Sequence, residues 1–286
     1  MSSYFHASPR IIHRLKQVQA LLDQLQPEEA AKAVITPGSP EPLGDIIVFP
    51  GSFNPPTTAH LAMLKQARQF TRQQALSSNT KSTIHLYAAL SKHIVDKERV
   101  ERATLLDRIM LTETLLRHRL PHTGIILFNR GLYVEQAQAV RTSFPKVKRL
   151  FFLLGFDKIV QILDPRYYEN RDAALEQLFG LAQLLVAPRG KDGIDALKSL
   201  LEQPQNQRFA RFIAALPLGK AYRDISSSRI RQHSDEYYGD EPREVRRFML
   251  ETRAYALPLR LANGTSVDYY EERVKAMNVL VHDSTV

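Results

Sequence analysis

A hydroxyl and an imidazole stand three residues apart where the sequence predicts the start of a helix. These side chains, Thr57 and His60, follow a loop in which Pro55 and Pro56 prevent helix formation and Gly51 permits a sharp turn. Residues three apart lie on the same face of a helix. Because the first turn also leaves backbone N–H groups unpaired, the spacing predicts an anion site of phosphate size. The alternative is an ordinary strand–turn–helix with a surface or core histidine.

A second anion cradle is predicted near the end of the core, after residue 225. Ser226, Ser227 and Ser228 precede a predicted helix, and serine side chains commonly cap the first turn of a helix. Arg231 comes four residues after Ser227, so it points back over that turn, and its guanidinium can bind a phosphate through two hydrogen bonds. A serine-capped helix with a later arginine is common, so this stretch alone is a modest indication of function.

Both stretches lie among strands and helices that alternate along the chain. Residues 46–49 form a continuous apolar run, which is typical of a parallel strand covered on both faces. Further strands are predicted at residues 83–90, 124–128, 149–154, 182–187 and 212–216, with helices at 57–76, 103–117, 134–143, from 156, and at 171–178. This alternation predicts an α/β fold with a doubly wound parallel sheet. Ligands of such sheets bind at the carboxyl ends of the strands, where the strand order reverses.

The predicted core has an extension at each end. Apolar residues at helical spacing predict a helix over residues 9–26, followed by a linker rich in proline and glycine at 36–42. Residues 242–255 and 267–280 are predicted to form C-terminal helices in which no chemistry is visible. We therefore divide the chain into an N-terminal helix and linker (1–43), an α/β domain (44–232) and a C-terminal helical extension (233–286).

Composition excludes several kinds of site. The 286 residues contain no cysteine, which excludes disulfides, thiolate zinc sites and cysteine nucleophiles, and the histidines show no metal-binding spacing. The formal net charge of +9 favours anionic partners, which include both nucleotides and nucleic acid. The apolar run at residues 150–156 is too short to span a bilayer, so we expect no membrane partner.

The first 22 residues bear on localisation. They lack the long apolar stretch of a secretory signal. They also lack acidic side chains and contain Arg10, Arg14 and Lys16, as a transit peptide would. An amphipathic accessory helix accounts for the same residues, and we expect a cytoplasmic protein.

The two candidate stretches resemble the signatures of one superfamily. Gly51-Ser52-Phe53-Asn54-Pro55, with Thr57 and His60, resembles the nucleotidyltransferase fingerprint in the version typical of eukaryotic-type nicotinamide/nicotinate mononucleotide adenylyltransferases. Residues 225–231 resemble the Ile-Ser-Ser-Thr-x-Ile-Arg motif of that superfamily, with Ser228 in place of threonine. Ala59 stands where most members have glycine. The resemblance covers about residues 44–255 and implies a Rossmann-like nucleotidyltransferase fold.

The resemblance also implies roles for individual residues. His60 would stabilise the transition state at the α- and β-phosphates of ATP, and Thr57 and Arg231 would be catalytic with it. The ATP-binding residues would be Gly51, Ser52, Phe53, Asn54, Ser226 and Ser227. The residues for the acceptor and the ribose would be Gly155, Asp157, Tyr167, Lys92 and Arg189. Tyr167 or Tyr168 stands about where the family stacks a tryptophan on the pyridine ring, and Lys97 is the alternative to Lys92.

The implied reaction is Mg²⁺-dependent adenylyl transfer, a step of NAD biosynthesis. The 5′-phosphate of nicotinamide or nicotinate mononucleotide would attack the α-phosphorus of ATP, giving NAD or its deamido form and pyrophosphate. The ion would arrive on the ATP phosphates with few protein ligands, so no protein metal site is predicted. The residue types in the two stretches are consistent with this reaction. Neither stretch pairs a nucleophile with a base, and such a transfer needs mainly positioning and charge neutralisation.

Two alternatives stay open at this point. A sister nucleotidyltransferase would act on another phosphate, such as phosphopantetheine or a phospho-alcohol, and the absence of tryptophan favours it. A nucleotide-sensing or RNA-binding relative without turnover is favoured by the positive charge but disfavoured by His60 and Arg231. We expect ATP and a pyridine mononucleotide as partners, and no nucleic acid. The preference between the two mononucleotides and the formation of a homo-oligomer stay open.

Overall fold

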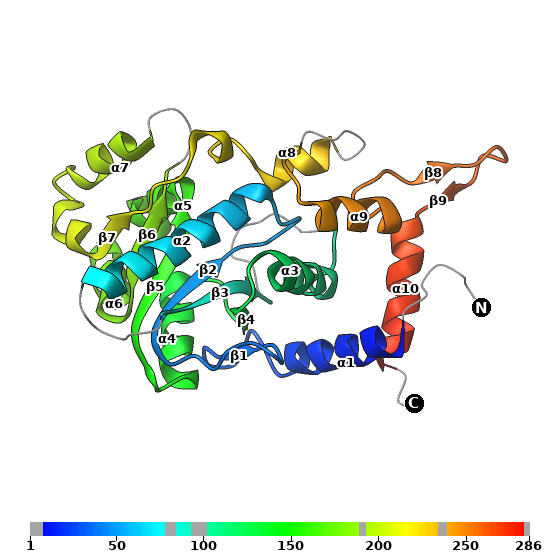
Figure 1. The fold of residues 1–286 in the computed structure, drawn as a ribbon, viewed down its shortest axis with the longest axis horizontal. Coiled ribbons are helices and arrows are strands. Elements are labelled where there is room, and N and C mark those ends of the chain that lie inside the picture. The colour runs from blue at the N-terminus through cyan, green and yellow to red at the C-terminus, as the bar shows by residue number, and fades with distance from the viewer. Residues whose placement is uncertain (1–7, 78–83, 93–101, 189–192, 234–238, 283–286) are drawn as a thin grey trace.

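A seven-stranded sheet organises the protein. The computed structural model describes residues 8–77, 84–92, 102–188, 193–233 and 239–282 (Figure 1). The strands are β1 (Ala33–Ile35), β2 (Gly44–Pro50), β3 (Ile84–Ser91), β4 (Thr123–Phe128), β5 (Val147–Gly155), β6 (Gln183–Ala187) and β7 (Ile213–Ala215). Their order in the sheet is β1-β4-β3-β2-β5-β6-β7, and all are parallel except β1, which runs antiparallel to β4. The predicted doubly wound parallel sheet is therefore confirmed.

Helices cover both faces of this sheet (Figure 1). One face carries α1 (Pro9–Asp23), α2 (Thr58–Ser77) and α3 (Leu105–Arg119), and the other carries α4 (Tyr133–Ser143), α5 (Phe156–Leu163), α6 (Arg171–Leu181) and α7 (Gly193–Leu201). Side chains of β2 alternate between the two layers: Ile47 and Phe49 pack with α2 and α3, while Ile46 and Val48 pack with α4 and α5. Burial on both sides explains why β2 is a continuous apolar run.

The strand order reverses between β2 and β5. From β2 the chain moves outward through β3 and β4, and it then returns to place β5 on the other side of β2. The register pairs Ile47 with Phe151 and Val48 with Phe152. Continuing this register sets Gly51 beside Gly155, so the loop after β2 and the turn after β5 meet at the edge where such folds bind ligands.

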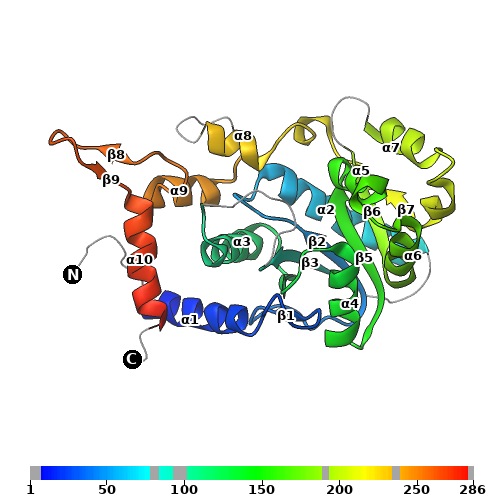
Figure 2. The ribbon, with the colours of Figure 1, turned by 180° about the vertical axis from the view of Figure 1, so that it is seen from behind.

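The C-terminal part of the chain packs beside α3 and α1. It comprises α8 (Ser227–Gln232), α9 (Arg243–Thr252), the short strands β8 (Leu259–Arg260) and β9 (Ser266–Val267), and α10 (Tyr269–His282). Figures 1 and 2 show α10 reaching the end of α1 while the β8–β9 hairpin projects from the body. Met277 of α10 and Leu15 of α1 belong to the same buried cluster. Of the two predicted C-terminal helices, the first is shorter in the structure and the second begins two residues later.

The elements β1, α7, β8 and β9 were not predicted from the sequence. Because β1 pairs with β4, the N-terminal segment supplies an edge strand of the sheet as well as a helix. No helix within the described ranges is long and apolar enough to cross a membrane.

Candidate active site

The loop after β2 (residues 51–57, the β2–α2 loop) has a fixed shape. The N–H of Gly51 donates to the carbonyl oxygen of Ala89 at 3.0 Å, which ties the start of the loop to β3. A Cβ atom at Gly51 would lie 3.1 Å from the ring of Phe53, so a side chain there would disturb the loop. Phe53 itself is 1% exposed and has a positive φ of 45°, which turns its ring into the core.

Thr57 sets the orientation and the tautomer of His60. The backbone N–H of Thr57 donates to Nδ1 of His60 at 3.0 Å, and the Thr57 hydroxyl lies 2.8 Å from the same nitrogen. An amide N–H can only donate, so Nδ1 presents a lone pair and the ring proton is on Nε2. The half-buried ring packs against both Phe49 and Phe53, at centroid distances of 5.6 and 5.0 Å. The arrangement prepares the Nε2–H of His60 as a hydrogen-bond donor.

The first turn of α2 is not the open anion site that the spacing predicted. The N–H of Thr57 bonds to His60, that of Thr58 bonds to the carbonyl oxygen of Asp240 at 2.8 Å, and that of His60 bonds to the Thr57 hydroxyl at 3.2 Å. Thr57 is 0% exposed, so in this structure its hydroxyl positions His60 and does not face a ligand. The N–H groups of Ser52 and Phe53, by contrast, make no hydrogen bond to any described part of the chain.

The structure brings the two signature stretches together. The hydroxyl of Ser227 donates to the carbonyl oxygen of Pro55 at 2.7 Å, and Nη1 of Arg231 donates to the carbonyl oxygen of Asn54 at 2.5 Å. Ser226 caps α8 by accepting the N–H of Arg229 at 3.2 Å. Figures 1 and 2 both show α8 beside the first turn of α2. Ser226, Ser227 and Arg231 are all partly exposed at this junction.

The side chain of Asn54 does not point toward solvent. It is 4% exposed, and its Oδ1 accepts the N–H of Ala103 at 3.0 Å and the hydroxyl of Tyr255 at 2.7 Å. Sequence reasoning placed Asn54 among the ATP-binding residues as a secondary polar contact and did not foresee Tyr255. No spacing rule links residues so far apart, so the sequence carries no signal for this contact.

The residues predicted for the acceptor lie at the carboxyl end of β5 and beyond. Gly155 caps α5, and a Cβ atom built on it would meet nothing within 4 Å. Asp157 is exposed in the first turn of α5. Tyr167 is 61% exposed, whereas Tyr168 is half-buried and donates its hydroxyl to the carbonyl oxygen of Ile162 at 2.8 Å. Tyr167 is therefore the tyrosine whose ring is accessible.

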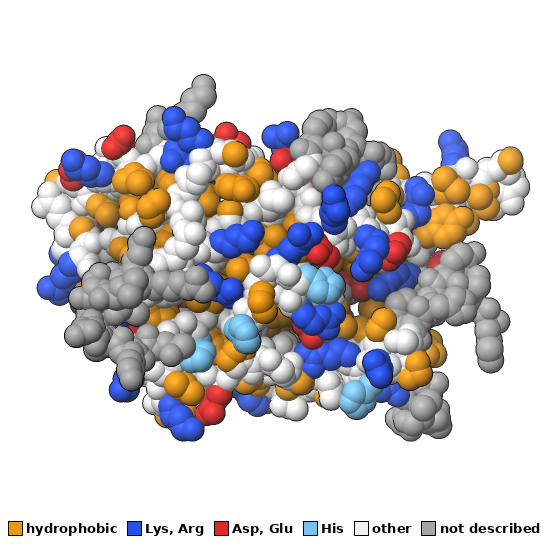
Figure 3. Space-filling view, in the orientation of Figure 1, with side chains coloured by type: hydrophobic (Ala, Val, Ile, Leu, Met, Phe, Trp, Pro, Cys, Tyr) orange, Lys and Arg blue, Asp and Glu red, His pale blue; other side chains and the backbone are white. Residues whose placement is uncertain are grey.

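Of the basic residues predicted for the acceptor side, only Lys92 lies within the described residues. Nζ of Lys92 donates to the carbonyl oxygen of Leu22 at 2.9 Å, so its ammonium group is engaged with the end of α1. Arg189 and Lys97 lie outside the described residues. Figure 3 shows Lys and Arg side chains spread over the face that carries α2 and α3, in keeping with the net charge of +9.

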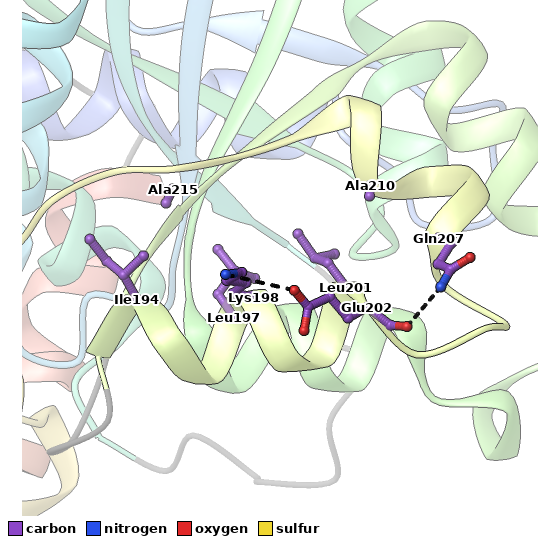
Figure 4. Close-up of a pocket in the computed structure, with 8 residues that line it drawn as sticks. All are labelled: Ile194, Leu197, Lys198, Leu201, Glu202, Gln207, Ala210 and Ala215. Atoms are coloured by element: carbon purple, nitrogen blue, oxygen red, sulfur yellow. Dashed lines mark hydrogen bonds and ion pairs between the residues drawn. The ribbon is translucent and has the colours of Figure 1, made fainter.

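Two hollows of the surface differ in their relation to the signature residues. One of about 710 Å³ is lined by Thr58 of α2 and Ile225, which precedes α8, and so touches both signature stretches. The other, of about 440 Å³, lies between α7 and residues 207–215 (Figure 4). Leu197, Leu201 and Ala210 line this second hollow, and no signature residue does. Residues 51–57, His60 and Arg231 line neither hollow. The hydrogen bonds that join the two signature stretches, rather than a cavity, place the candidate site at the β2–α2 loop.

Donors, not metal ligands, dominate the candidate site. In the described ranges, no three or more histidine or carboxylate side chains are grouped so that they could hold a metal ion. The junction of α2 and α8 holds an imidazole N–H, serine hydroxyls and a guanidinium, which can bind phosphate oxygens. It also holds the carboxylate of Asp240, which lies 3.6 Å from Nε of Arg229. The nearby turn after β5 contributes one exposed carboxylate, Asp157.

A comparison with known families decides the assignment. A family model described as cytidylyltransferase-like matches residues 48–233. The chain belongs to this cytidylyltransferase-like family. The match contains the β2–α2 loop, the turn after β5 and α8, and it confirms the predicted nucleotidyltransferase superfamily. It ends before α9, so α9, the hairpin and α10 lie outside the matched region.

Individual proteins that are similar to this chain are named as mononucleotide adenylyltransferases. A protein of Schizosaccharomyces pombe named "Putative nicotinamide mononucleotide adenylyltransferase" is 25% identical over 200 residues, which are 65% of this chain and 74% of that protein. Plasmodium falciparum nicotinic acid mononucleotide adenylyltransferase complexed with APC is 16% identical with a TM-score of 0.46, over 74% of this chain and 96% of that one. The same enzyme complexed with NaAD gives a TM-score of 0.49 at 16% identity, over 74% and 97%.

Proposed function

We propose that this member of the family transfers the adenylyl group of ATP to the 5′-phosphate of nicotinamide or nicotinate mononucleotide. The products would be NAD or its deamido form, and pyrophosphate. The observation that carries the proposal is the junction of the two signature stretches, where Ser227 and Arg231 bond to the carbonyl oxygens of Pro55 and Asn54. That junction gathers phosphate-binding groups beside the Nε2–H of His60.

The proposed reaction is an in-line transfer at phosphorus. An oxygen of the mononucleotide phosphate forms a bond to the α-phosphorus, and the bond from that phosphorus to the bridging oxygen of the β-phosphate breaks. Negative charge spreads over the non-bridging oxygens in the transition state, so preorganised donors accelerate the step without any covalent intermediate. His60 would donate from Nε2 to an oxygen between the α- and β-phosphates. The N–H groups of Ser52 and Phe53 would donate to the same region.

Residues of α8 would hold the leaving group. Ser226, Ser227 and Arg231 would bind the β- and γ-phosphates, which stabilises the pyrophosphate as it departs. Arg231 is already oriented by its hydrogen bonds to the carbonyl oxygen of Asn54 and to the Ser228 hydroxyl, the latter at 3.2 Å. Thr57 would act on the reaction through the orientation of His60, and Gly51 through the backbone approach that it permits.

The donor set at the site fits an Mg²⁺ ion that arrives on the triphosphate. Only Asp157 offers a carboxylate at the turn after β5, and Mg²⁺ usually keeps several waters and few protein ligands when it is bound to substrate phosphates. When bound, the ion neutralises charge on the phosphates. His60 and Arg231 then supply the positioned donors.

The acceptor side of the proposal rests on Gly155, Asp157 and Tyr167. A carboxylate in the first turn of α5 can accept hydrogen bonds from ribose hydroxyls, and the accessible ring of Tyr167 can stack on a pyridine ring. The name of the Schizosaccharomyces pombe relative supports a pyridine mononucleotide as the acceptor. Lys92 and Arg189 stay proposals for phosphate and adenosine contacts.

A second candidate function is a sister reaction on another phosphate. The chain contains no tryptophan, which favours an acceptor without a pyridine ring, such as phosphopantetheine or a phospho-alcohol. The description of the matched family also leaves CTP open as the nucleotide donor. Both candidates use the same donors around His60.

Pyrophosphate release by the purified protein tests the proposal. Mg-ATP and Mg-CTP are each offered with nicotinamide mononucleotide, nicotinate mononucleotide, phosphopantetheine, phosphocholine or no acceptor, and the products are identified by mass spectrometry. Release that requires ATP and a pyridine mononucleotide, and that yields the dinucleotide, is the expected result. Pyrophosphate release only with another acceptor would support the sister reaction. If ATP binds but no acceptor leads to pyrophosphate release, the result would support a nucleotide-binding relative that lacks catalytic activity.

A further inference from the structure

We propose that Tyr255, which lies beyond the matched family region, is a positioning residue for the phosphate-binding donors of the β2–α2 loop. Tyr255 acts through Asn54. In this way the C-terminal extension helps to fix the conformation of the β2–α2 loop. The effect on catalysis rests on the proposed function, whereas the effect on the loop itself does not. The family model matches residues 48–233, and Tyr255 lies outside that range.

Tyr255 completes the set of donors around Asn54. Its hydroxyl donates to Oδ1 of Asn54 at 2.7 Å across 201 positions of the chain. The same oxygen accepts the N–H of Ala103 at 3.0 Å, and the backbone oxygen of Asn54 accepts Nη1 of Arg231. Both oxygens of one buried residue are thus satisfied by groups from the start of α3, from α8 and from the segment after α9. Burial raises the pKa of Tyr255, so its hydroxyl remains a donor.

A second buried side chain fixes the neighbouring peptide of the loop. Nη1 of Arg108 donates to the carbonyl oxygen of Ser52 at 2.7 Å, and its Nε donates to the carbonyl oxygen of Ala103 at 3.2 Å. The C=O and N–H of a trans peptide point in opposite directions, so the N–H of Phe53 is directed away from Arg108. Arg108 and Tyr255 together draw the oxygens of the loop toward α3 and leave this N–H on the other side.

The C-terminal extension holds Tyr255 and α3 in a common network. The hydroxyl of Tyr270 in α10 donates to Oδ2 of Asp107 at 2.8 Å and accepts the N–H of Thr104 at 2.7 Å. Nη2 of Arg273 forms an ion pair with Oδ1 of Asp107 at 2.8 Å. Asp107 is 2% exposed, so these contacts are shielded from water. They fix the start of α3, which is the element that supplies Ala103 and Arg108 to the loop.

This network is important because the loop has no regular backbone hydrogen bonds of its own. Residues 51–57 belong to no helix or strand, so their backbone order depends on contacts from other elements. Donors accelerate a charge-spreading reaction only when they are already oriented toward the charge that develops. Loss of one anchor should therefore lower turnover more than it lowers affinity for ATP.

The first test compares Tyr255→Phe with Tyr87→Phe. Each change deletes one largely buried hydroxyl that donates to a single oxygen. The Tyr87 hydroxyl donates to the carbonyl oxygen of Pro40 at 3.0 Å, and among the described residues no hydrogen bond joins Tyr87 to the loop. We expect Tyr255→Phe to lower kcat about ten-fold, with little change in the KM for ATP, and Tyr87→Phe to leave kcat unchanged. Equal kcat values for the two variants would overturn the proposal.

A double-mutant cycle tests whether Tyr255 acts through Asn54. If it does, Tyr255→Phe should have little further effect on kcat in a protein that already carries Asn54→Ala. If the fold-losses in kcat of the two single variants multiply in the double variant, Tyr255 does not act through Asn54.

Hydrogen exchange separates this inference from the proposed function. Amide exchange of residues 49–60, measured by mass spectrometry without any substrate, should be faster in Tyr255→Phe than in both Tyr87→Phe and the unchanged protein. Unchanged exchange in this segment would overturn the positioning role, whatever the activity. Failure of the unchanged protein to release pyrophosphate would instead overturn the proposed function, and the exchange result would still decide the role of Tyr255.

Discussion

The hydroxyl of Ser227 donates a hydrogen bond of 2.7 Å to the carbonyl oxygen of Pro55, although 172 positions separate the two residues. This bond, with that of Arg231 to Asn54, closes the gap between the loop after β2 and the start of α8. In the proposed function, phosphate-binding groups from both ends of the family match would thereby act on one ligand.

Removal of the His60 ring should abolish most of the turnover. We expect His60→Ala to lower kcat by about 10²- to 10³-fold, the scale seen when one transition-state donor is deleted. His60→Asn should lose a similar factor, because an amide reaches less far, yet it can still accept the N–H of Thr57 and should unfold at a higher temperature than His60→Ala. Steady-state kinetics and thermal unfolding measure the two effects. His13→Ala, on the exposed surface of α1, is the control, and near-normal turnover in His60→Ala would refute the role of His60.

The Thr57 hydroxyl should influence turnover through His60. Thr57→Val keeps the shape of the side chain but loses the contact with Nδ1 of His60 and the cap for its backbone N–H. We expect a loss of about 1 kcal/mol in the free energy of unfolding and a lower kcat, while Thr57→Ser retains both. Urea denaturation and initial rates measure these changes. A Thr57→Val protein with full kcat would show that the orientation of His60 does not depend on the hydroxyl.

Arg231 should not be replaceable by lysine. Its guanidinium makes two directed hydrogen bonds, to the carbonyl oxygen of Asn54 and to the hydroxyl of Ser228, and a lysine ammonium cannot reproduce this fork. We expect Arg231→Lys to lower kcat/KM for ATP by about 10- to 100-fold. Arg247→Lys, on the exposed side of α9, is the matched control. An unchanged kcat/KM in Arg231→Lys would mean that only the positive charge matters.

The regular core could be predicted from the sequence because its signals are local. The apolar run of β2 and the alternation with helices such as α4 depend on residues that are close together in the chain. β1 could not be predicted in this way, because three residues carry too little pattern and their order comes from pairing with β4, as Val34 does with Leu127. The two-residue strands of the hairpin escape prediction for the same reason.

The site shows the same division between local and distant contacts. The spacing of Thr57 and His60 predicted that they share a face, and they do make contact. Spacing could not show that Thr57 is buried or that Asp240 accepts the N–H of Thr58, because the segment that covers α2 follows some 180 residues later. The contact of Tyr255 with Asn54 likewise depends only on the tertiary fold.

Tyr167 should determine affinity for a pyridine acceptor. Its ring is 61% exposed, so Tyr167→Phe should retain stacking and Tyr167→Ala should raise the KM for the mononucleotide about three- to ten-fold without changing the KM for ATP. Tyr168→Phe is the control, because it removes the bond to the carbonyl oxygen of Ile162 and should affect thermal stability alone. An equal KM in Tyr167→Ala would favour an acceptor that is held without ring stacking.

Lys92 should contribute to stability more than to ATP binding. Its ammonium donates to the carbonyl oxygen of Leu22, in the last turn of α1, where unpaired carbonyl oxygens favour a positive charge. We expect Lys92→Met, which keeps the apolar stem, to lower the free energy of unfolding by about 1 kcal/mol and to leave the KM for ATP unchanged. Lys148→Met, on the exposed side of β5, should change neither quantity. A raised KM for ATP with unchanged unfolding would instead support the phosphate contact proposed for Lys92, and would require its ammonium to leave α1 when the nucleotide binds.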